Sequence, residues 1–238
     1  MEDLDLVYSA RPLAKSQGLS EHVHQALLQM LVQGVLKRGM VLRIDLLAKT
    51  LDVSPTPVRE ALARLATTGL VLHEPRKGYT IAPPLDRKQL GELIDARRLI
   101  EVAAVGRACD NGGAGFIRDL EKALDRQRRA VDAYRANKDA DSGALAWDLM
   151  LTDLQFHQTI FDNTDNRFIR VMSQALSAQL HRIRQSAQAG ISDESHALTE
   201  HEAVLAALRS GDRAAAERAM EQHIDNVEKR SELDLTDQ

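Results

Sequence analysis

Four side chains in the second half of the chain have the types and the spacing of a metal site. Asp153 and His157 are four residues apart, so on a helix both side chains lie on one face. His201 and His223 flank the turn Ser210-Gly211, and in two antiparallel helices they lie within about one helical turn of each other in height. One carboxylate and three imidazoles could then converge in a bundle core, which is the usual place for a metal site in such folds. The residues alone leave open that these imidazoles are exposed or hydrogen-bonded.

Such a donor set defines the chemistry that the site could perform. Three neutral imidazoles and one carboxylate leave a divalent ion with a net charge of about +1 and open coordination positions, which an organic carboxylate could complete. No cysteine lies near these positions, since the single one is Cys109, and the donors therefore suit Zn, Ni, Co or Mn. An open position could also activate water, so the alternative function is a helical-bundle metalloenzyme of hydrolase type. Against it, no further general base is apparent, and the first 84 residues would have no task.

A second group of candidate residues is basic and lies between positions 37 and 77. This segment holds eight basic and four acidic residues, a balance of +4, although the whole chain has a net charge of −4. The first 84 residues have a balance of +2 and the remainder −6. A locally basic segment beside an acidic body indicates a nucleic-acid-binding module on a larger sensor or enzyme. The alternative is a chance fluctuation of surface charge.

The elements that would position these basic residues form a helix-turn-helix. Apolar spacing predicts three helices, with Ser20, Asp45 and Ser54 as their N-caps, at residues 19–36, 46–51 and 55–68. Pro55 suits the first position of the third helix, and Gly69 ends it. Residues 70–74 and 79–82 are predicted strands joined by a basic turn, which is a hairpin wing. Polar candidates for DNA contact lie off the apolar face of the third helix and in the wing: Thr56, Arg59, Arg64, Arg76 and Lys77.

The first half of the chain resembles the winged-helix domain of GntR-family bacterial transcriptional regulators. The most specific part is the run Thr56-Pro57-Val58-Arg59-Glu60-Ala61-Leu62, with Lys77-Gly78 at the wing. The resemblance implies a regulator that binds double-stranded, palindromic operator DNA as a homodimer. It places the third helix in the major groove, with Thr56 and Arg59 as contacts, and the wing tip in the minor groove, with Arg76, Lys77 and Gly78 as contacts. Pro55 stands where the family usually has an arginine, so an operator sequence cannot be transferred from relatives.

The second half of the chain is predicted to be helical throughout. Pro83-Pro84 is a stiff link, which divides the chain into a winged helix over residues 1–83 and an all-α effector-binding and dimerisation domain over residues 84–238. Six helices are expected in an antiparallel bundle, at residues 86–109, 116–136, 144–161, 166–188, 195–209 and 212–229. The predicted fold class is therefore mainly α, a small α+β winged helix followed by a helical bundle.

This bundle resembles the effector-binding domain of the FadR-type GntR subfamily. The motifs that carry the resemblance include Asp153-Leu154-Gln155-Phe156-His157, Glu200-His201 and His223-Ile224. In many members of the subfamily an Asp and three His bind a divalent metal, which implies Asp153, His157, His201 and His223 as ligands here. Arg97 matches a family arginine that often faces the pocket, which implies contact with a carboxylate effector. A structural salt bridge to Glu101 is the alternative for Arg97.

Composition limits the remaining possibilities. Aromatic residues make up only 3% of the 238 residues, which favours helices over a β-sandwich. The acidic N-terminus is unlike a signal peptide, no apolar run approaches a membrane span, and a single cysteine suits a reducing compartment, so a cytoplasmic location is expected. The sequence thus predicts a ligand-responsive transcriptional regulator and not an enzyme, while the effector, the operator and the regulated pathway are not encoded in it.

Overall fold

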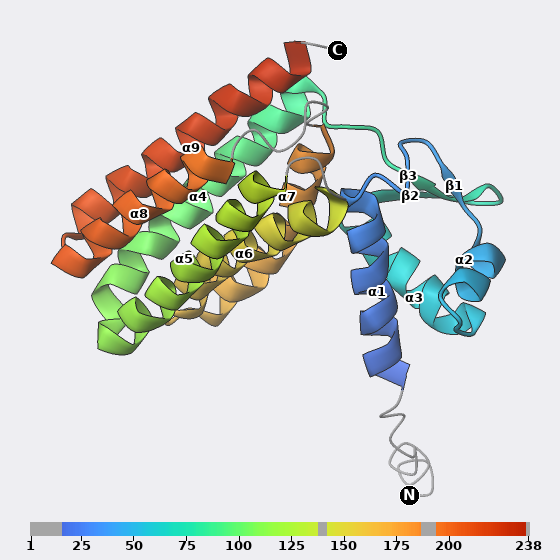
Figure 1. Ribbon diagram of the computed structural model, residues 1–238, viewed down its shortest axis with the longest axis horizontal. Helices are drawn as coiled ribbons and strands as arrows, with labels where there is room; N and C mark the ends of the chain where they lie inside the picture. The colour runs from blue at the N-terminus through green and yellow to red at the C-terminus, as the bar shows by residue number, and fades with distance from the viewer. Residues whose placement is uncertain (1–15, 138–141, 187–193, 237–238) are drawn as a thin grey trace, which may run out of the picture.

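The computed structural model describes residues 16–137, 142–186 and 194–236. Within these ranges the chain is mainly helical with one small antiparallel sheet, as the sequence predicts. Figure 1 shows a long helical bundle on one side and a small mixed unit on the other, with the first helix upright between them. No helix in the described part of the chain combines the length and the apolar character needed to cross a membrane.

The N-terminal unit is a winged helix. Its helices are α1 (Ser16–Val32), α2 (Ile44–Thr50) and α3 (Pro55–Thr67), and its strands are β1 (Val41–Leu42), β2 (Val71–Glu74) and β3 (Gly78–Ile81). The strand order is β1-β3-β2, with Val41 opposite Thr80 and Glu74 opposite Gly78. Buried side chains of α1, α3 and the sheet form one hydrophobic core, in which Leu27, Leu62 and Leu65 have no exposed surface.

The predicted helix starts in this unit need correction. Helix α1 begins at Ser16, so Ser20 is not its N-cap but a buried residue inside the helix. The N-cap of α2 is Arg43, and Asp45 lies in the first turn, where it pairs with Arg43 at 2.6 Å. Ser54 is the N-cap of α3 as expected, but its side chain makes no capping hydrogen bond.

Pro57 removes one of the two donors that a capping side chain could use. Such a side chain accepts from the N–H of the second or third helical residue, and the third residue of α3 is Pro57, which has no N–H. The α1 helix also ends earlier than predicted, at Val32, because Gly34 adopts a positive φ of 71° and turns the chain. Strand β1, with only two residues, was not predicted.

Six helices follow the link, close to the predicted positions: α4 (Arg87–Asn111), α5 (Gly113–Ala136), α6 (Ser142–Asp162), α7 (Arg167–Ser186), α8 (Glu194–Ser210) and α9 (Arg213–Thr236). Asp86 caps α4, since its carboxylate accepts from the Gln89 N–H at 2.7 Å while the Gln89 side chain accepts from the Asp86 N–H at 3.2 Å. The predicted break at residues 111–115 is wrong, because only Gly112 separates α4 from α5.

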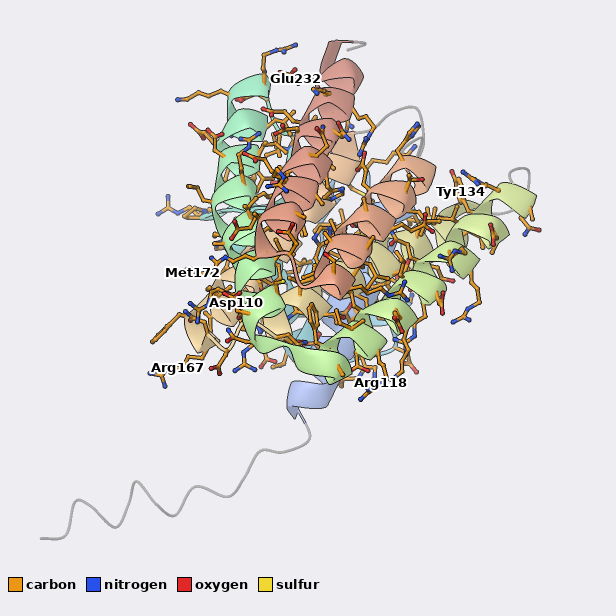
Figure 2. The ribbon with its side chains drawn as sticks, turned by 90° about the vertical axis from the view of Figure 1, so that its left-hand side faces the viewer. Asp110, Arg118, Tyr134, Arg167, Met172 and Glu232 are labelled. Atoms are coloured by element: carbon orange, nitrogen blue, oxygen red, sulfur yellow. The ribbon has the colours of Figure 1, made fainter. Side chains whose placement is uncertain are left out.

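The bundle has its own hydrophobic core, built mainly from α4, α5, α6, α8 and α9. The most extensive pairings are α4 with α9, α5 with α6 and α8 with α9, and Figure 2 shows α4, α9, α8 and α5 side by side. Arg98 ties α4 to α9 through Asp225 at 2.9 Å and Glu228 at 3.1 Å. Two separate cores thus lie on either side of Pro83-Pro84, while the exact domain boundary stays a prediction.

Candidate metal centre and DNA-binding surface

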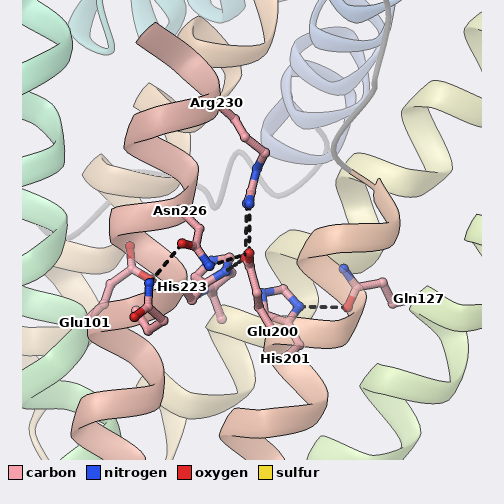
Figure 3. A network of polar contacts seen from close by, with 9 residues as sticks. Glu101, Gln127, Glu200, His201, His223, Asn226 and Arg230 are labelled. Carbon is pink, nitrogen blue, oxygen red and sulfur yellow. Dashed lines mark hydrogen bonds and ion pairs between the residues drawn. The ribbon is translucent and has the colours of Figure 1, made fainter. Parts of the chain in front are cut away.

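Three of the four predicted metal ligands come together in the bundle core. His157 of α6, His201 of α8 and His223 of α9 are all buried, and each offers a ring nitrogen that lies within 4.8 Å of the other two. The α8–α9 hairpin, which turns at Gly211 with a φ of 71°, brings His201 and His223 to similar heights as the sequence indicates. Figure 3 shows these two rings between α8 and α9, among their polar partners.

Hydrogen bonds determine which nitrogen of each ring can bind a metal. Nδ1 of His201 lies 2.8 Å from Oε1 of Gln127, and Nδ1 of His223 lies 2.7 Å from Oε2 of Glu200. Amide and carboxylate oxygens only accept, so both Nδ1 atoms must donate a proton. The lone pair of each neutral ring is then on Nε2, as in the metal-binding histidines of known sites.

The third imidazole has a charged partner. Nδ1 of His157 lies 2.8 Å from Oε2 of Glu101, whose other oxygen accepts from Nε of Arg97 at 2.6 Å. Burial raises the pKa of Glu101, but the positive charge of Arg97 and the contact with His157 outweigh this and hold the pKa well below its usual value. Glu101 is therefore a carboxylate that accepts a hydrogen bond from Arg97 on one oxygen and lies against the His157 ring with the other.

Glu200 performs the same function for His223 and is itself held by two other residues. Asn226 donates to its Oε1 at 2.9 Å, and Arg230 donates to both oxygens at 2.7 and 3.0 Å. Burial raises the pKa of Glu200, but the hydrogen bonds from His223 and Arg230 outweigh burial and lower the pKa to about 2. Burial also lowers the pKa of His223, which favours the neutral ring that a metal requires.

Asp153, the fourth predicted ligand, lies close to the triad but not within it. It is buried on α6, four residues before His157, and its negative charge acts on His223. Among the described residues, the ligand atoms that lie within 4.8 Å of one another come from the three imidazoles only. Its assignment as a ligand stays a prediction.

The residues present fit a divalent metal. The Nε2 atoms of His157 and His223 are fully buried and have no hydrogen-bond partner among the described residues. A buried ring nitrogen without a partner costs free energy, which a bound cation would recover. Phe156 stacks on His201 with ring centroids 4.0 Å apart and thereby fixes the plane of that imidazole.

The sequence reasoning gave no role to four polar residues of this site, Gln127, Glu200, Asn226 and Arg230. Gln127 follows the buried positions Leu120 and Leu124 on one face of α5, so a polar residue at an apolar position was a signal for it. Glu200 has no such local signal, because it lies on α8 and its partner His223 lies on the neighbouring helix α9. Arg97 is 3% exposed and forms the salt bridge with Glu101 that the sequence left as its alternative.

The predicted DNA-contacting residues lie on one helix and one hairpin. Thr56 and Arg59 are exposed on the first two turns of α3. Arg76 and Lys77 are exposed in the turn between β2 and β3, with Arg76 at a positive φ of 71° and Gly78 at 88°. Lys77 pairs with Glu74 at 2.6 Å. Arg64 instead contacts Glu21 of α1 at 2.7 Å, so it joins α3 to α1.

Comparisons with known proteins match both units. Residues 19–81 match the model of bacterial regulatory proteins of the gntR family, and residues 92–226 match the FCD domain. The gluconate operon transcriptional repressor of Bacillus subtilis is 27% identical, over 98% of this chain and 92% of the relative. The HTH-type transcriptional repressor RspR of Escherichia coli is 27% identical over 90% of each chain.

Solved structures show the same fold. Escherichia coli McbR/YncC superposes with a TM-score of 0.70 at 22% identity, over 87% of this chain and 94% of that one. A putative transcriptional regulator GntR from Rhodococcus sp. RHA1 superposes with a TM-score of 0.69 at 22% identity, over 89% of this chain and 96% of that one. The relatives are transcriptional regulators, which excludes the metalloenzyme alternative. A winged helix followed by an FCD bundle over most of its length identifies the chain as a member of the GntR family of bacterial transcriptional regulators, in its FadR-type subfamily.

Proposed function

We propose that this regulator binds operator DNA as a homodimer and senses a small organic carboxylate at a divalent metal in its bundle. The observation that supports the metal is the convergence of three buried imidazoles whose Nδ1 atoms are engaged by oxygens. With only nitrogen and oxygen donors, the metal would be Zn, Ni, Co or Mn. Asp153 would act as the fourth ligand from the same face of α6 as His157.

The effector would be recognised by charge at two places. When bound, the metal supplies positive charge and open coordination positions to a carboxylate. Arg97 adds a buried guanidinium near His157, because both contact Glu101. Only Nε of Arg97 is used in that salt bridge, so its terminal nitrogens could donate to the effector.

DNA recognition would use α3 and the wing. Arg59 is exposed and can pair with guanine O6 and N7, while Thr56, Arg76 and Lys77 can contact base edges or phosphates. Gly78 would let the backbone of the wing tip approach DNA closely. Arg64 would contribute less to phosphate binding than the other basic residues, because its guanidinium is already paired with Glu21.

The DNA assignment predicts the effect of removing one guanidinium. Arg59→Ala should weaken binding to an operator selected from random DNA by about 1–3 kcal/mol, while leaving thermal stability unchanged. Arg118→Ala, which removes an exposed arginine from α5 of the bundle, is the matched control. Titration of labelled operator DNA, followed by fluorescence anisotropy, measures the affinity of each variant. Equal affinities of the Arg59 variant and the wild type would contradict the role of Arg59.

The metal assignment predicts a graded loss of metal. His201→Ala should abolish binding of Zn²⁺ in equilibrium dialysis, because it removes a ligand. Gln127→Ala should weaken binding about 10–100-fold, because it removes the acceptor that orients the His201 ring. His196→Ala, which changes an exposed histidine two residues into α8, is the control. Near-unit stoichiometry and wild-type affinity in the His201 variant would refute the ligand set.

The sensor assignment predicts that carboxylate binding requires the metal. Acetate, succinate and citrate should be tested by thermal unfolding of the Zn²⁺-loaded and the chelated protein. At least one should raise the stability of the loaded form only, by about 2.7 kcal/mol at a hundred times its dissociation constant. Equal shifts in both forms would separate carboxylate recognition from the metal, and the absence of any shift would contradict the proposed effector class.

The homodimer would form through the outer face of α7. Phe168, Val171 and Met172 are 60%, 63% and 53% exposed, and their spacing places them on one side of the helix. Exposed apolar side chains grouped in this way are typical of an interaction surface. Arg167 and Arg170 on α7 are exposed, as are Glu92 and Asp95 on α4, which packs against α7. Basic and acidic margins on adjacent helices suit pairing with a second copy across a two-fold axis.

This dimer surface predicts a change in mass. Val171→Asp should convert the dimer to a monomer in size-exclusion chromatography with light scattering, because it buries a charge in an apolar contact. Val35→Asp is the matched control, since Val35 is 55% exposed in the turn after α1. A dimeric Val171 variant would place the contact elsewhere, whereas a monomeric wild type would contradict the homodimer itself.

A further inference from the structure

Helix α6 contributes to the metal centre and also contacts the winged helix. His157 belongs to the imidazole triad, and Asp153 is the candidate fourth ligand. Trp147, near the N-terminal end of the same helix, is half-buried and packs against the hydrophobic core of the winged helix. Helix α6 also contacts α1, which Figure 1 shows between α6 and α3.

The stretch of α6 between these residues is an uninterrupted helix that we expect to move as a rigid body. Residues 147–157 form continuous helix and contain no glycine or proline. Trp147 precedes His157 by ten residues, about 15 Å along the axis, and its side chain points about 120° away from that of Asp153. One edge of α6 therefore faces the metal centre while another edge meets the winged helix.

The hydrophobic core that Trp147 contacts extends to α3, the helix proposed to bind DNA. This core includes Leu27 and Leu31 of α1 and Leu62 of α3, all almost fully buried. The Arg64–Glu21 ion pair at 2.7 Å adds a second tie between α3 and α1. Because a packed core transmits small displacements, a shift of Trp147 would be passed to α3 through a single intervening helix.

We propose that Trp147 couples the metal centre to the winged helix, so that occupation of the metal site biases the placement of α3. This inference rests on the proposed metal site and names the route by which that site acts. Metal binding alters the position or the rigidity of α6 at His157, and Trp147 carries this change into the core shared by α1 and α3. Such coupling requires that the metal bind one arrangement better than the other.

Hydrogen exchange of the full-length protein, with and without Zn²⁺ alone, tests the coupling. In the wild type, Zn²⁺ should slow exchange of amides in α8 and α9, which hold two of the three imidazoles of the triad, and also in α1, which contributes no residue to the triad. We expect the α1 amides to slow about fivefold or more, the lower end of ordinary allosteric coupling. The chain has one tryptophan, so its emission on addition of Zn²⁺ reports the same contact without any substitution.

The variants separate coupling from metal binding. Trp147→Ala should keep the Zn²⁺ response of α8 and α9 but lose that of α1, and Trp147→Phe should restore the α1 response. Leu151→Ala, which truncates a 40% exposed side chain one turn further along α6, is the control and should behave as wild type. An α1 response in Trp147→Ala equal to that of the wild type would overturn the proposal.

Two results in the wild type would also be decisive. If α8 and α9 respond to Zn²⁺ while α1 and the tryptophan emission do not change, the coupling is wrong but the metal site stands. If dialysis finds no bound Zn²⁺ and no helix responds, the proposed metal site itself fails, and the coupling fails with it.

Discussion

The geometry of the site depends on the acceptors that hold the three Nδ1 atoms. Gln127, Glu200 and Glu101 come from α5, α8 and α4, whereas the imidazoles come from α8, α9 and α6. The hydrogen bonds to Gln127 and Glu200 fix the tautomers of His201 and His223, Glu101 lies beside the His157 ring, and a ring nitrogen of each imidazole lies within 4.8 Å of the other two. The triad therefore exists only when five helices pack in the correct register, which makes bundle packing and metal binding one linked property.

Burying this polar network costs stability, and the chain offsets that cost with charge. Glu101 and Glu200 would be unfavourable in the core without Arg97 and Arg230, which lower the pKa of each carboxyl. Apolar side chains of similar volume would give an equally stable bundle, because a buried ion pair adds little net stability over them. The network is thus better explained by the need to orient imidazoles than by a need to stabilise the fold.

The sequence predicted what local patterns encode and missed what distant contacts decide. Apolar spacing located the helices, and the turn at Gly211 placed His201 opposite His223. Strand β1 was missed because two residues carry no periodicity, and it forms only by pairing with β3. Gln127 and Glu200 were missed as partners because each meets a histidine of another helix, a relation that spacing along the chain does not contain.

The connection between the two units explains why a contact as small as that of Trp147 can matter. On one side of the link, Ala82 donates to the Leu70 carbonyl at 3.0 Å, and on the other side Leu85 lies in the bundle core. If the winged helix were held by this link alone, it could rotate about the link, and a change at the metal site would not affect the position of α3. The packing of Trp147 against the winged-helix core provides a second attachment point on α6. Together with the contacts of α1 to α6 and α7, this attachment restrains rotation of the winged helix about the link, so a change at His157 that moves α6 becomes a constraint on α3.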